Sequence, residues 1–298
     1  MLEFKTVRLE DMSWYKELAD RANEIQPRLN LDAPFALNYI WRNRYGIKIC
    51  RFEDFILKAY FRKDGAIAFT FPYGVGDVDK ALRAIEAYAG ENNLPLLWGS
   101  LSLEQTEIIN SCFGGRFSFA SCRDYSEYIY ESERLAYLPG RKLHSKRNHL
   151  KRFEASYSYS FEQINNDNKE EAYKVAQQWC AESSADGCKD DSEFCAIRDS
   201  IDNFDALGLE GAIIRIDGKA VAMTIGEEVS KAAFVTHFEK ALSGYDGLYT
   251  AINCYFARAL KDRYKYINRE EDLGIEGLRK SKLSYRPDIL LERFEGCE

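Results

Sequence analysis

The order of strand-like and helix-like segments most constrains the fold, because that order occurs twice along the 298 residues. In the first half, a strand and a helix precede three strands that are separated by tight turns. A capped helix, a strand, a second helix and two further strands then follow. These segments cover residues 4–9, 11–21, 47–52, 55–61, 66–71, 77–93, 96–100, 103–112, 116–122 and 125–130.

The second half repeats this order with little residue identity, so the repeat is one of pattern. Its strands cover 157–164, 211–216, 220–229, 232–239, 264–268 and 289–294, and its helices cover 169–185, 192–206, 248–263 and 277–283. Strands that alternate with helices in this way predict mixed sheets covered by helices. Because a chain of this length is expected to form two domains, we predict an α/β fold with two similar lobes, 1–135 and 136–298.

Composition and missing motifs exclude several classes of function. The net charge of −7 disfavours binding of nucleic acid by the whole surface. The sequence lacks a serine-hydrolase elbow, a Walker A loop and a dinucleotide fingerprint. It has three histidines and eight cysteines but no Cys-x-x-Cys pair, so we expect no metal site. The N-terminus has no leader-like apolar region and no run is long enough to span a membrane, which predicts a cytoplasmic protein with reduced cysteines.

One segment departs strongly from the acidic average. Residues 140–153 contain six basic side chains, and they predict a helix with its leucines on one side and most cations on the other. Such a surface suits the phosphates of tRNA, a nucleotide or lipid head groups. The candidate anion-binding residues are Arg141, Lys142, Lys146 and Arg147. The alternative is a solvated helix between lobes, paired with the acidic stretch 186–205.

Three parts of the sequence together carry a resemblance. They are the three-strand meander with its following glycine loop and helix, the basic run 140–153, and the run 268–287. The chain resembles a bacterial family of uncharacterised tandem-GNAT proteins, in which two acyltransferase-type lobes are fused. That family is similar to the C-terminal domain of phosphatidylglycerol lysyltransferase and, more distantly, to the peptidoglycan aminoacyltransferases.

The resemblance implies a donor site in the second lobe. The donor lies along the fourth strand, 232–240, at Val235 and Thr236, and its anionic part meets the loop of Gly244 and Gly247. Asn268 and Arg269, after the next strand, are also implied to bind the donor. Backbone N–H groups at a helix start can hold phosphates in such a loop. The two glycines are three residues apart and lack the usual preceding Arg or Gln, so we expect no tightly bound cofactor and a donor that is coenzyme A or aminoacyl-tRNA.

Acyl transfer also needs groups that move protons. His237 lies on the fourth strand and titrates in the range of a base near neutral pH. Glu239 shares its face by strand alternation, and Glu227 and Glu228 are alternatives on the meander. Tyr285 stands where the resemblance implies a proton donor to the leaving group.

These observations predict an acyl- or aminoacyl-transferase that acts on an amine or a hydroxyl. The expected partners are a small-molecule, lipid or peptide acceptor, and tRNA if tRNA carries the donor group. The alternative is a non-catalytic module of the same fold that binds a nucleotide, RNA or a protein partner.

Overall fold

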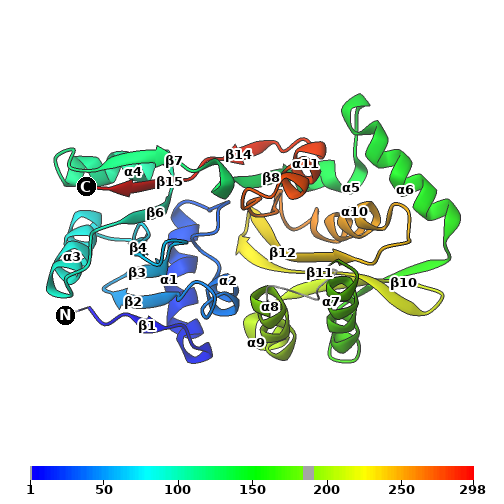
Figure 1. Ribbon diagram of the computed structural model, residues 1–298, viewed down its shortest axis with the longest axis horizontal. Helices are drawn as coiled ribbons and strands as arrows, with labels where there is room; N and C mark the ends of the chain where they lie inside the picture. The colour runs from blue at the N-terminus through cyan, green and yellow to red at the C-terminus, as the bar shows by residue number, and fades with distance from the viewer. Residues whose placement is uncertain (1, 184–190) are drawn as a thin grey trace. The chain divides into compact units, whose positions relative to one another are not determined.

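The computed structural model describes residues 2–183 and 191–298. The chain forms two compact units, each with its own sheet. Unit 1 contains Met1–Glu127, Glu271–Ile275 and Leu290–Glu298, and unit 2 contains Tyr128–Glu270 and Glu276–Ile289. Figure 1 labels the helices and strands of both units and colours the chain from its N-terminus to its C-terminus.

The sheet of unit 1 has four antiparallel strands followed by a parallel one. β1 to β4 pair antiparallel in sequence order, and β4 then pairs parallel with β6 at Phe69 and Trp98. β15 pairs antiparallel with both β6 and β7 at the far edge. The strands are β1 (Lys5–Thr6), β2 (Lys48–Phe52), β3 (Phe55–Phe61), β4 (Ile67–Phe69), β5 (Tyr73–Gly74, paired with β3), β6 (Trp98–Leu101), β7 (Ser118–Ser121) and β15 (Phe294–Cys297).

The main helices of unit 1 begin at side-chain caps that the sequence supplies. The Asp77 carboxylate accepts a hydrogen bond from the Lys80 N–H (3.1 Å) and starts α3 (Val78–Glu91). Ser102 and Gln105 form a capping box at the start of α4 (Leu103–Cys112). The apolar faces of both helices pack into a core with β3, β4 and β6. The other helices of this unit are η1 (Leu9–Asp11), α1 (Met12–Ile25), α2 (Phe35–Ile40) and η2 (Arg123–Tyr125).

The sheet of unit 2 repeats the same pattern. β9 to β12 pair antiparallel in sequence order, and β12 then pairs parallel with β13. β8 pairs antiparallel with β13 and is followed by β14 at the edge. The strands are β8 (Glu127–Glu131), β9 (Tyr159–Gln163), β10 (Glu210–Ile216), β11 (Lys219–Ser230), β12 (Ala233–Ala241), β13 (Tyr266–Asn268) and β14 (Ile289–Leu291).

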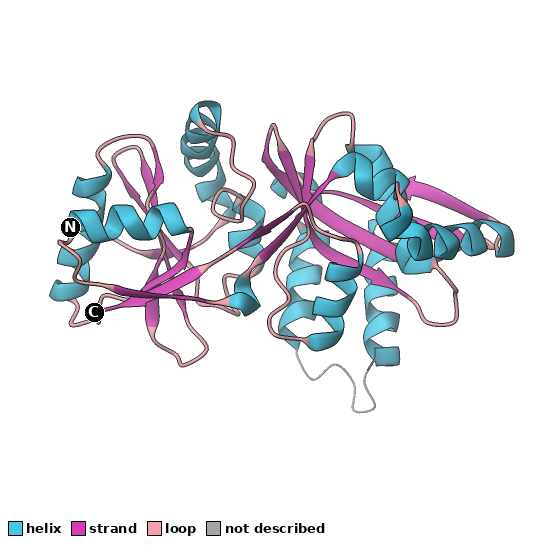
Figure 2. Ribbon diagram, turned by 90° about the horizontal axis from the view of Figure 1, so that it is seen from above, coloured by secondary structure: helices cyan, strands magenta, loops and turns pink. Residues whose placement is uncertain are grey.

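Helices cover both faces of this second sheet. α10 lies on one face of β11 and β12, and α7 and α8 lie on the other (Figure 1). Figure 2 shows the helices and strands from above. α10 is buried along almost its whole length. The helices of this unit are α5 (Ser132–Tyr137), η3 (Arg141–Leu143), α6 (His144–Ser156), α7 (Lys169–Ser183), α8 (Asp191–Asp202), α9 (Phe204–Leu207), α10 (Leu248–Leu260) and α11 (Glu276–Ser284).

The two mixed sheets confirm the predicted α/β class, but the units differ from the predicted lobes 1–135 and 136–298. In each sheet the strand beyond the parallel pair comes from a distant part of the chain. β15, at the C-terminal end, completes the sheet of unit 1, and β8, near the middle, completes that of unit 2. The predicted last strand, 289–294, is therefore two strands in two different sheets.

Two further expectations concern the cysteines and the acidic stretch 186–205. Cys180 on α7 is disulfide-bonded, which corrects the expectation that all cysteines are reduced; Cys50, Cys112, Cys122, Cys195, Cys254 and Cys297 are free thiols. Part of the acidic stretch 186–205, and the end of the predicted helix 169–185, lie outside the described residues.

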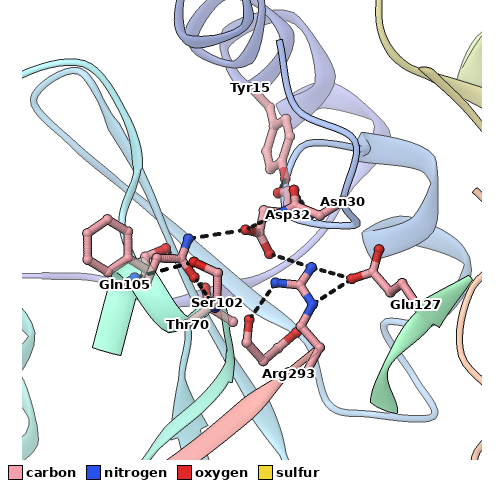
Figure 3. A network of polar contacts seen from close by, with 10 residues as sticks. Tyr15, Asn30, Asp32, Thr70, Ser102, Gln105, Glu127 and Arg293 are labelled. Carbon is pink, nitrogen blue, oxygen red and sulfur yellow. Dashed lines mark hydrogen bonds and ion pairs between the residues drawn. The ribbon is translucent and has the colours of Figure 1, made fainter. Parts of the chain in front are cut away.

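Arg293, just before β15, is the most deeply buried cation of unit 1, with a side chain that is 1% exposed. Its Nε donates to the Glu127 carboxylate (2.6 Å) and its Nη1 donates to the Ser100 carbonyl (3.1 Å). Asp32 lies on the other side of the guanidinium and also accepts from Gln105. Figure 3 shows Arg293 between these two carboxylates. Because a buried charge is tolerated only when it is paired, this network fixes the last strand to unit 1.

We therefore expect Arg293→Met to lower the free energy of unfolding by about 3–5 kcal/mol, because it leaves Glu127 buried without its cation. Urea denaturation measures this change. The matched control is Arg51→Met, an exposed arginine on β2 of the same sheet, which should change stability by less than about 0.5 kcal/mol. The double variant Glu127→Gln/Arg293→Met should lose less than the two single variants added together. Equal stability of Arg293→Met and the parent would contradict this account.

Candidate functional site

A pocket of about 280 Å³ opens in unit 2 where α10 begins. It receives side chains from α6, from β12, from the segment after β13 and from the end of α11. The polar lining residues on which the site depends are Lys146, Glu239, Thr250, Arg269, Ser281 and Tyr285. The sequence-predicted donor and catalytic residues thus meet here in part.

The pairing of β12 with β13 creates the space for this pocket. The parallel register ends at Val235 and Asn268, whereas β12 continues to Ala241. The register between β11 and β12 also shifts at Ile225 and Gly226, so that His237 is the extra residue of a β-bulge. Only glycine fits at 226, since a Cβ there would lie 1.9 Å from the Val235 carbonyl oxygen. The residues beyond the bulge therefore face the segment that follows β13.

Two ionic bridges span the strands beyond this point. The Nδ1 of His237 lies 2.8 Å from the Glu270 carboxylate, and Arg269 Nη2 donates to Glu239 Oε1 (2.7 Å). All four residues are largely buried. The gap between β12 and the segment after β13 is thus filled by side chains rather than left open.

His237 has a carboxylate on each ring nitrogen. Its Nε2 lies 3.0 Å from Glu227 Oε1, opposite the contact with Glu270. Burial alone would lower the pKa of His237, but the hydrogen bonds to Glu227 and Glu270 outweigh it and raise that pKa to about 9. The imidazole is therefore a cation at neutral pH with both nitrogens occupied. This geometry argues against the predicted role of His237 as a free general base and indicates a positioning role.

Glu239 is held from two sides. Arg269 binds one carboxylate oxygen, and the Nδ2 of Asn253 on α10 donates to the other (3.1 Å). Among the described residues, the Arg269 Nη1 and the Asn253 Oδ1 are buried without a hydrogen-bond partner. Buried polar atoms of this kind usually find a partner, because leaving them unpaired costs free energy. Hydrogen-bonding capacity therefore remains unused beside Glu239.

Tyr285 lines the pocket with its aromatic ring. Its ring lies under two cations, since Lys146 Nζ is 4.2 Å and Arg269 Cζ is 5.0 Å from the ring centroid. Its hydroxyl donates to Thr250 Oγ1 (3.4 Å). Burial raises the pKa of the Tyr285 phenol, so the hydroxyl keeps its proton near neutral pH. Burial and, next, the charge of Arg269 lower the pKa of Lys146.

The two loop glycines differ in their surroundings although both have positive φ, +85° at Gly244 and +80° at Gly247. Nothing lies within 4 Å of a Cβ built on Gly244, whereas a Cβ on Gly247 would lie 2.3 Å from the His149 carbonyl oxygen. Gly247 therefore lets α6 approach the loop, besides lining the pocket. It is also the N-cap of α10, which has no side-chain cap, so the first N–H groups of the helix lack intrahelical acceptors.

The basic segment forms η3 and α6, and a helix was predicted there, but its cations differ in their surroundings. Arg141 and Lys142 are exposed on η3. Lys146 enters the pocket, while Arg147 donates to the carbonyls of Leu138 and Gly140. An open groove of about 410 Å³ runs along α6 and is lined by Ser145, Asn148, His149, Lys151 and Arg152. His149 also lines the pocket, so the groove and the pocket share this residue.

The structure thus brings together five of the predicted residues, namely Lys146, Glu239, Gly247, Arg269 and Tyr285. Val235, Thr236 and Asn268 are buried in β12 and β13 and do not line the pocket, nor do Gly244, Arg141, Lys142 and Arg147. Asn253 and Glu270 were missed. The amide of Asn253, within the mostly apolar run 248–260, was a signal that would have found the first.

Within the described ranges, no group of histidine, cysteine and acidic side chains could hold a metal ion. None of the helices in those same ranges is long and apolar enough to cross a membrane.

Comparison with known proteins gives a family and a fold. The family model of phosphatidylglycerol lysyltransferase, C-terminal, matches residues 24–295. A crystal structure of a conserved protein of unknown function from Bacteroides thetaiotaomicron is 34% identical, with a TM-score of 0.92, and the match covers 100% of this chain and 99% of that one. None of the curated proteins matches the chain.

More distant solved structures share the fold. The C-terminal domain of a putative lysylphosphatidylglycerol synthetase from Agrobacterium fabrum is 15% identical, with a TM-score of 0.67, over 95% of this chain and 92% of that one. FemX is 8% identical, with a TM-score of 0.62, over 98% of this chain and 96% of that one.

The bridges around His237 predict a specific pH dependence. Because the pKa of about 9 in the folded protein lies above the ordinary histidine value of 6.5, the cation stabilises the fold fully below about pH 6.5, and this contribution is lost as the pH rises through 9. The free energy of unfolding should fall across that window in the parent, and His237→Gln should remove this part of the fall. An NMR titration of the imidazole that shows a midpoint at or below 6.5 would contradict the assignment.

The loop glycines give a second prediction. Gly244→Ala should cost about 1 kcal/mol, because alanine disfavours positive φ. Gly247→Ala should cost clearly more, because its Cβ also meets the backbone of His149 at 2.3 Å. Thermal or urea denaturation of both variants measures the difference. Equal losses would show that α6 does not depend on the missing side chain of Gly247.

Proposed function

The chain belongs to the family of the phosphatidylglycerol lysyltransferase C-terminal domain, and from this we propose that it is an acyl- or aminoacyl-transferase whose donor group enters the pocket of unit 2. The observation that carries the proposal is the meeting of Glu239, Arg269 and Tyr285 at the uncapped start of α10. The pocket combines a carboxylate, a protonated phenol and free hydrogen-bond donors, which are the groups that acyl transfer needs.

In the proposed reaction, an amine or hydroxyl of the acceptor attacks the donor carbonyl. Glu239 accepts the proton that the nucleophile loses, and the carbonyl oxygen gains negative charge near the positive end of α10. When the tetrahedral intermediate collapses, the bond to the leaving group breaks and Tyr285 donates a proton to it. The raised pKa of the Tyr285 phenol, which burial causes, suits a donor that is protonated at neutral pH. His237 holds Glu270, beside Arg269, and takes no part in proton transfer.

We further propose that the donor is aminoacyl-tRNA rather than coenzyme A. The bridges His237–Glu270 and Arg269–Glu239 fill the gap between the strands, where a thin thioester arm would have to pass. The cationic groove of α6 adjoins the pocket at His149. A polyanion along this groove would bring its acyl end to the pocket, with affinity that falls as salt rises.

The acceptor follows the family description. That description names phosphatidylglycerol, so a lipid hydroxyl is the first acceptor to test and a peptide amine the second. Acyl-CoA compounds serve as competing donors in the same assay.

The test is transfer of a radiolabelled acyl group from charged tRNAs or acyl-CoAs to phosphatidylglycerol vesicles or to peptide amines. We expect Glu239→Gln to lower turnover by about 10²- to 10⁴-fold, as for loss of a general base. Tyr285→Phe, which keeps the ring, should also lower it. The matched controls are Glu210→Gln, another carboxylate held by an arginine, and Tyr264→Phe, which removes a hydroxyl that donates to Glu228. Both lie outside the pocket and should keep the parental rate.

The alternative is a module of this family that binds RNA, a nucleotide or a protein partner without chemistry. Salt-dependent binding of tRNA without transfer from any donor would favour this alternative. Transfer by Glu239→Gln at the parental rate would be compatible with a transferase but would show that another group accepts the proton.

A further inference from the structure

We infer that Arg269 and Lys146 form an oxyanion subsite in the pocket of unit 2, so that this pocket holds a carboxylate or phosphate and refuses a lysyl side chain. The inference deepens the proposed function, because it assumes that the same pocket receives a substrate group. It also departs from the family description, which names a lysyl group.

The charges of the lining residues have the wrong sign for a lysyl ammonium. Lys146 and Arg269 are cations, and Glu239 is the one carboxylate among the residues that line the pocket. Both oxygens of Glu239 are already engaged, one by Arg269 Nη2 (2.7 Å) and the other by Asn253 Nδ2 (3.1 Å). An incoming ammonium group would therefore meet two cations and a single carboxylate whose charge Arg269 already compensates.

Arg269 points to a missing acceptor. Its side chain is 11% exposed, and its Nη1 is buried with no hydrogen-bond partner among the described residues. A guanidinium presents its donors in a rigid planar fork that matches carboxylate and phosphate groups. An oxygen atom of a bound anion would satisfy Nη1 while Nη2 keeps its bond to Glu239.

Lys146 supplies the second half of the subsite. Lys146 Nζ and Arg269 Cζ lie 4.2 Å and 5.0 Å from the centroid of the Tyr285 ring. Two cations that converge on one ring repel each other, and a bound anion relieves that repulsion. The lowered pKa of Lys146, due to burial and then to Arg269, is consistent with this crowding. The uncapped start of α10 adds its partial positive charge at the same place.

The experiment is isothermal titration of the full chain with inorganic phosphate, succinate and lysinamide, each at low ionic strength. We expect at least one of the two anions to bind and lysinamide not to bind. Binding of phosphate alone would identify a phosphate of the donor or the acceptor as the occupant, and binding of succinate alone would identify an acidic acyl group. Both outcomes support the subsite.

Lysine-to-methionine variants locate the bound anion. Lys146→Met keeps the aliphatic stem but removes the charge, and we expect it to weaken anion binding about tenfold. Lys280→Met on α11 is the matched control, because Lys280 is exposed and lines neither the pocket nor the groove, and Lys151→Met tests the groove of α6. Both should bind the anion as the parent does.

Three results would overturn the inference. They are binding of lysinamide in preference to both anions, binding of neither anion, and equal loss in Lys146→Met and Lys151→Met, which would place the anion in the groove of α6. These measurements need no transfer, so they separate the subsite from the proposed function. Anion binding without transfer would support the subsite and contradict the transferase. Transfer of a lysyl group would support the transferase and contradict the subsite.

Discussion

The parallel pairing of β12 with β13 ends at Val235 and Asn268, and the site of unit 2 depends on this early end. Beyond it, β12 continues without a strand partner on that side, and its inward-facing residues must be satisfied by side chains. His237 and Glu239 are those residues, and Glu270 and Arg269 are the side chains that meet them. A longer β13 would extend the backbone ladder and leave no pocket at the start of α10.

Unit 1 shows the same geometry with a different outcome. There the parallel contact between β4 and β6 is limited to Phe69 and Trp98, and a buried arginine again donates to groups beyond it. Arg293 has two carboxylates, Glu127 and Asp32, as partners, so its charge is fully compensated. Arg269 has only Glu239, and one of its nitrogens is unpartnered among the described residues. The same topological gap is therefore filled by ion pairs in both units, and in unit 2 one guanidinium nitrogen has no hydrogen-bond partner among the described residues.

Sequence patterns predicted the elements well, because strands and helices leave their periods in the sequence. They did not predict which strand joins which sheet. The run 289–294 alternates like one strand, yet its two halves pair in different sheets, and the choice depends on the buried Arg293. Long-range partners of this kind carry no local signal.

Long-range contacts also explain which properties of the site residues could not be predicted from the sequence. Strand alternation pointed to Glu239 and the family resemblance pointed to Arg269 and Tyr285, and the structure brings these three residues to one pocket. His237 looked like a base because its two carboxylate partners, Glu227 and Glu270, come from separate strands and raise its pKa only in the fold. Gly244 and Gly247 look equivalent in the sequence, and only the carbonyl of His149 distinguishes them.

Buried ion pairs are a costly way to fill a gap between strands, since well-packed apolar side chains often stabilise a protein as much or more. An apolar pair in place of Arg269 and Glu239 would close the gap equally well. It would not leave a guanidinium nitrogen without a partner at a pocket that Lys146 also lines. Arg269 thus joins the two strands through Nη2, while its buried Nη1 has no hydrogen-bond partner among the described residues. The polar filling of the gap therefore fits the proposed anion subsite better than a role in stability alone.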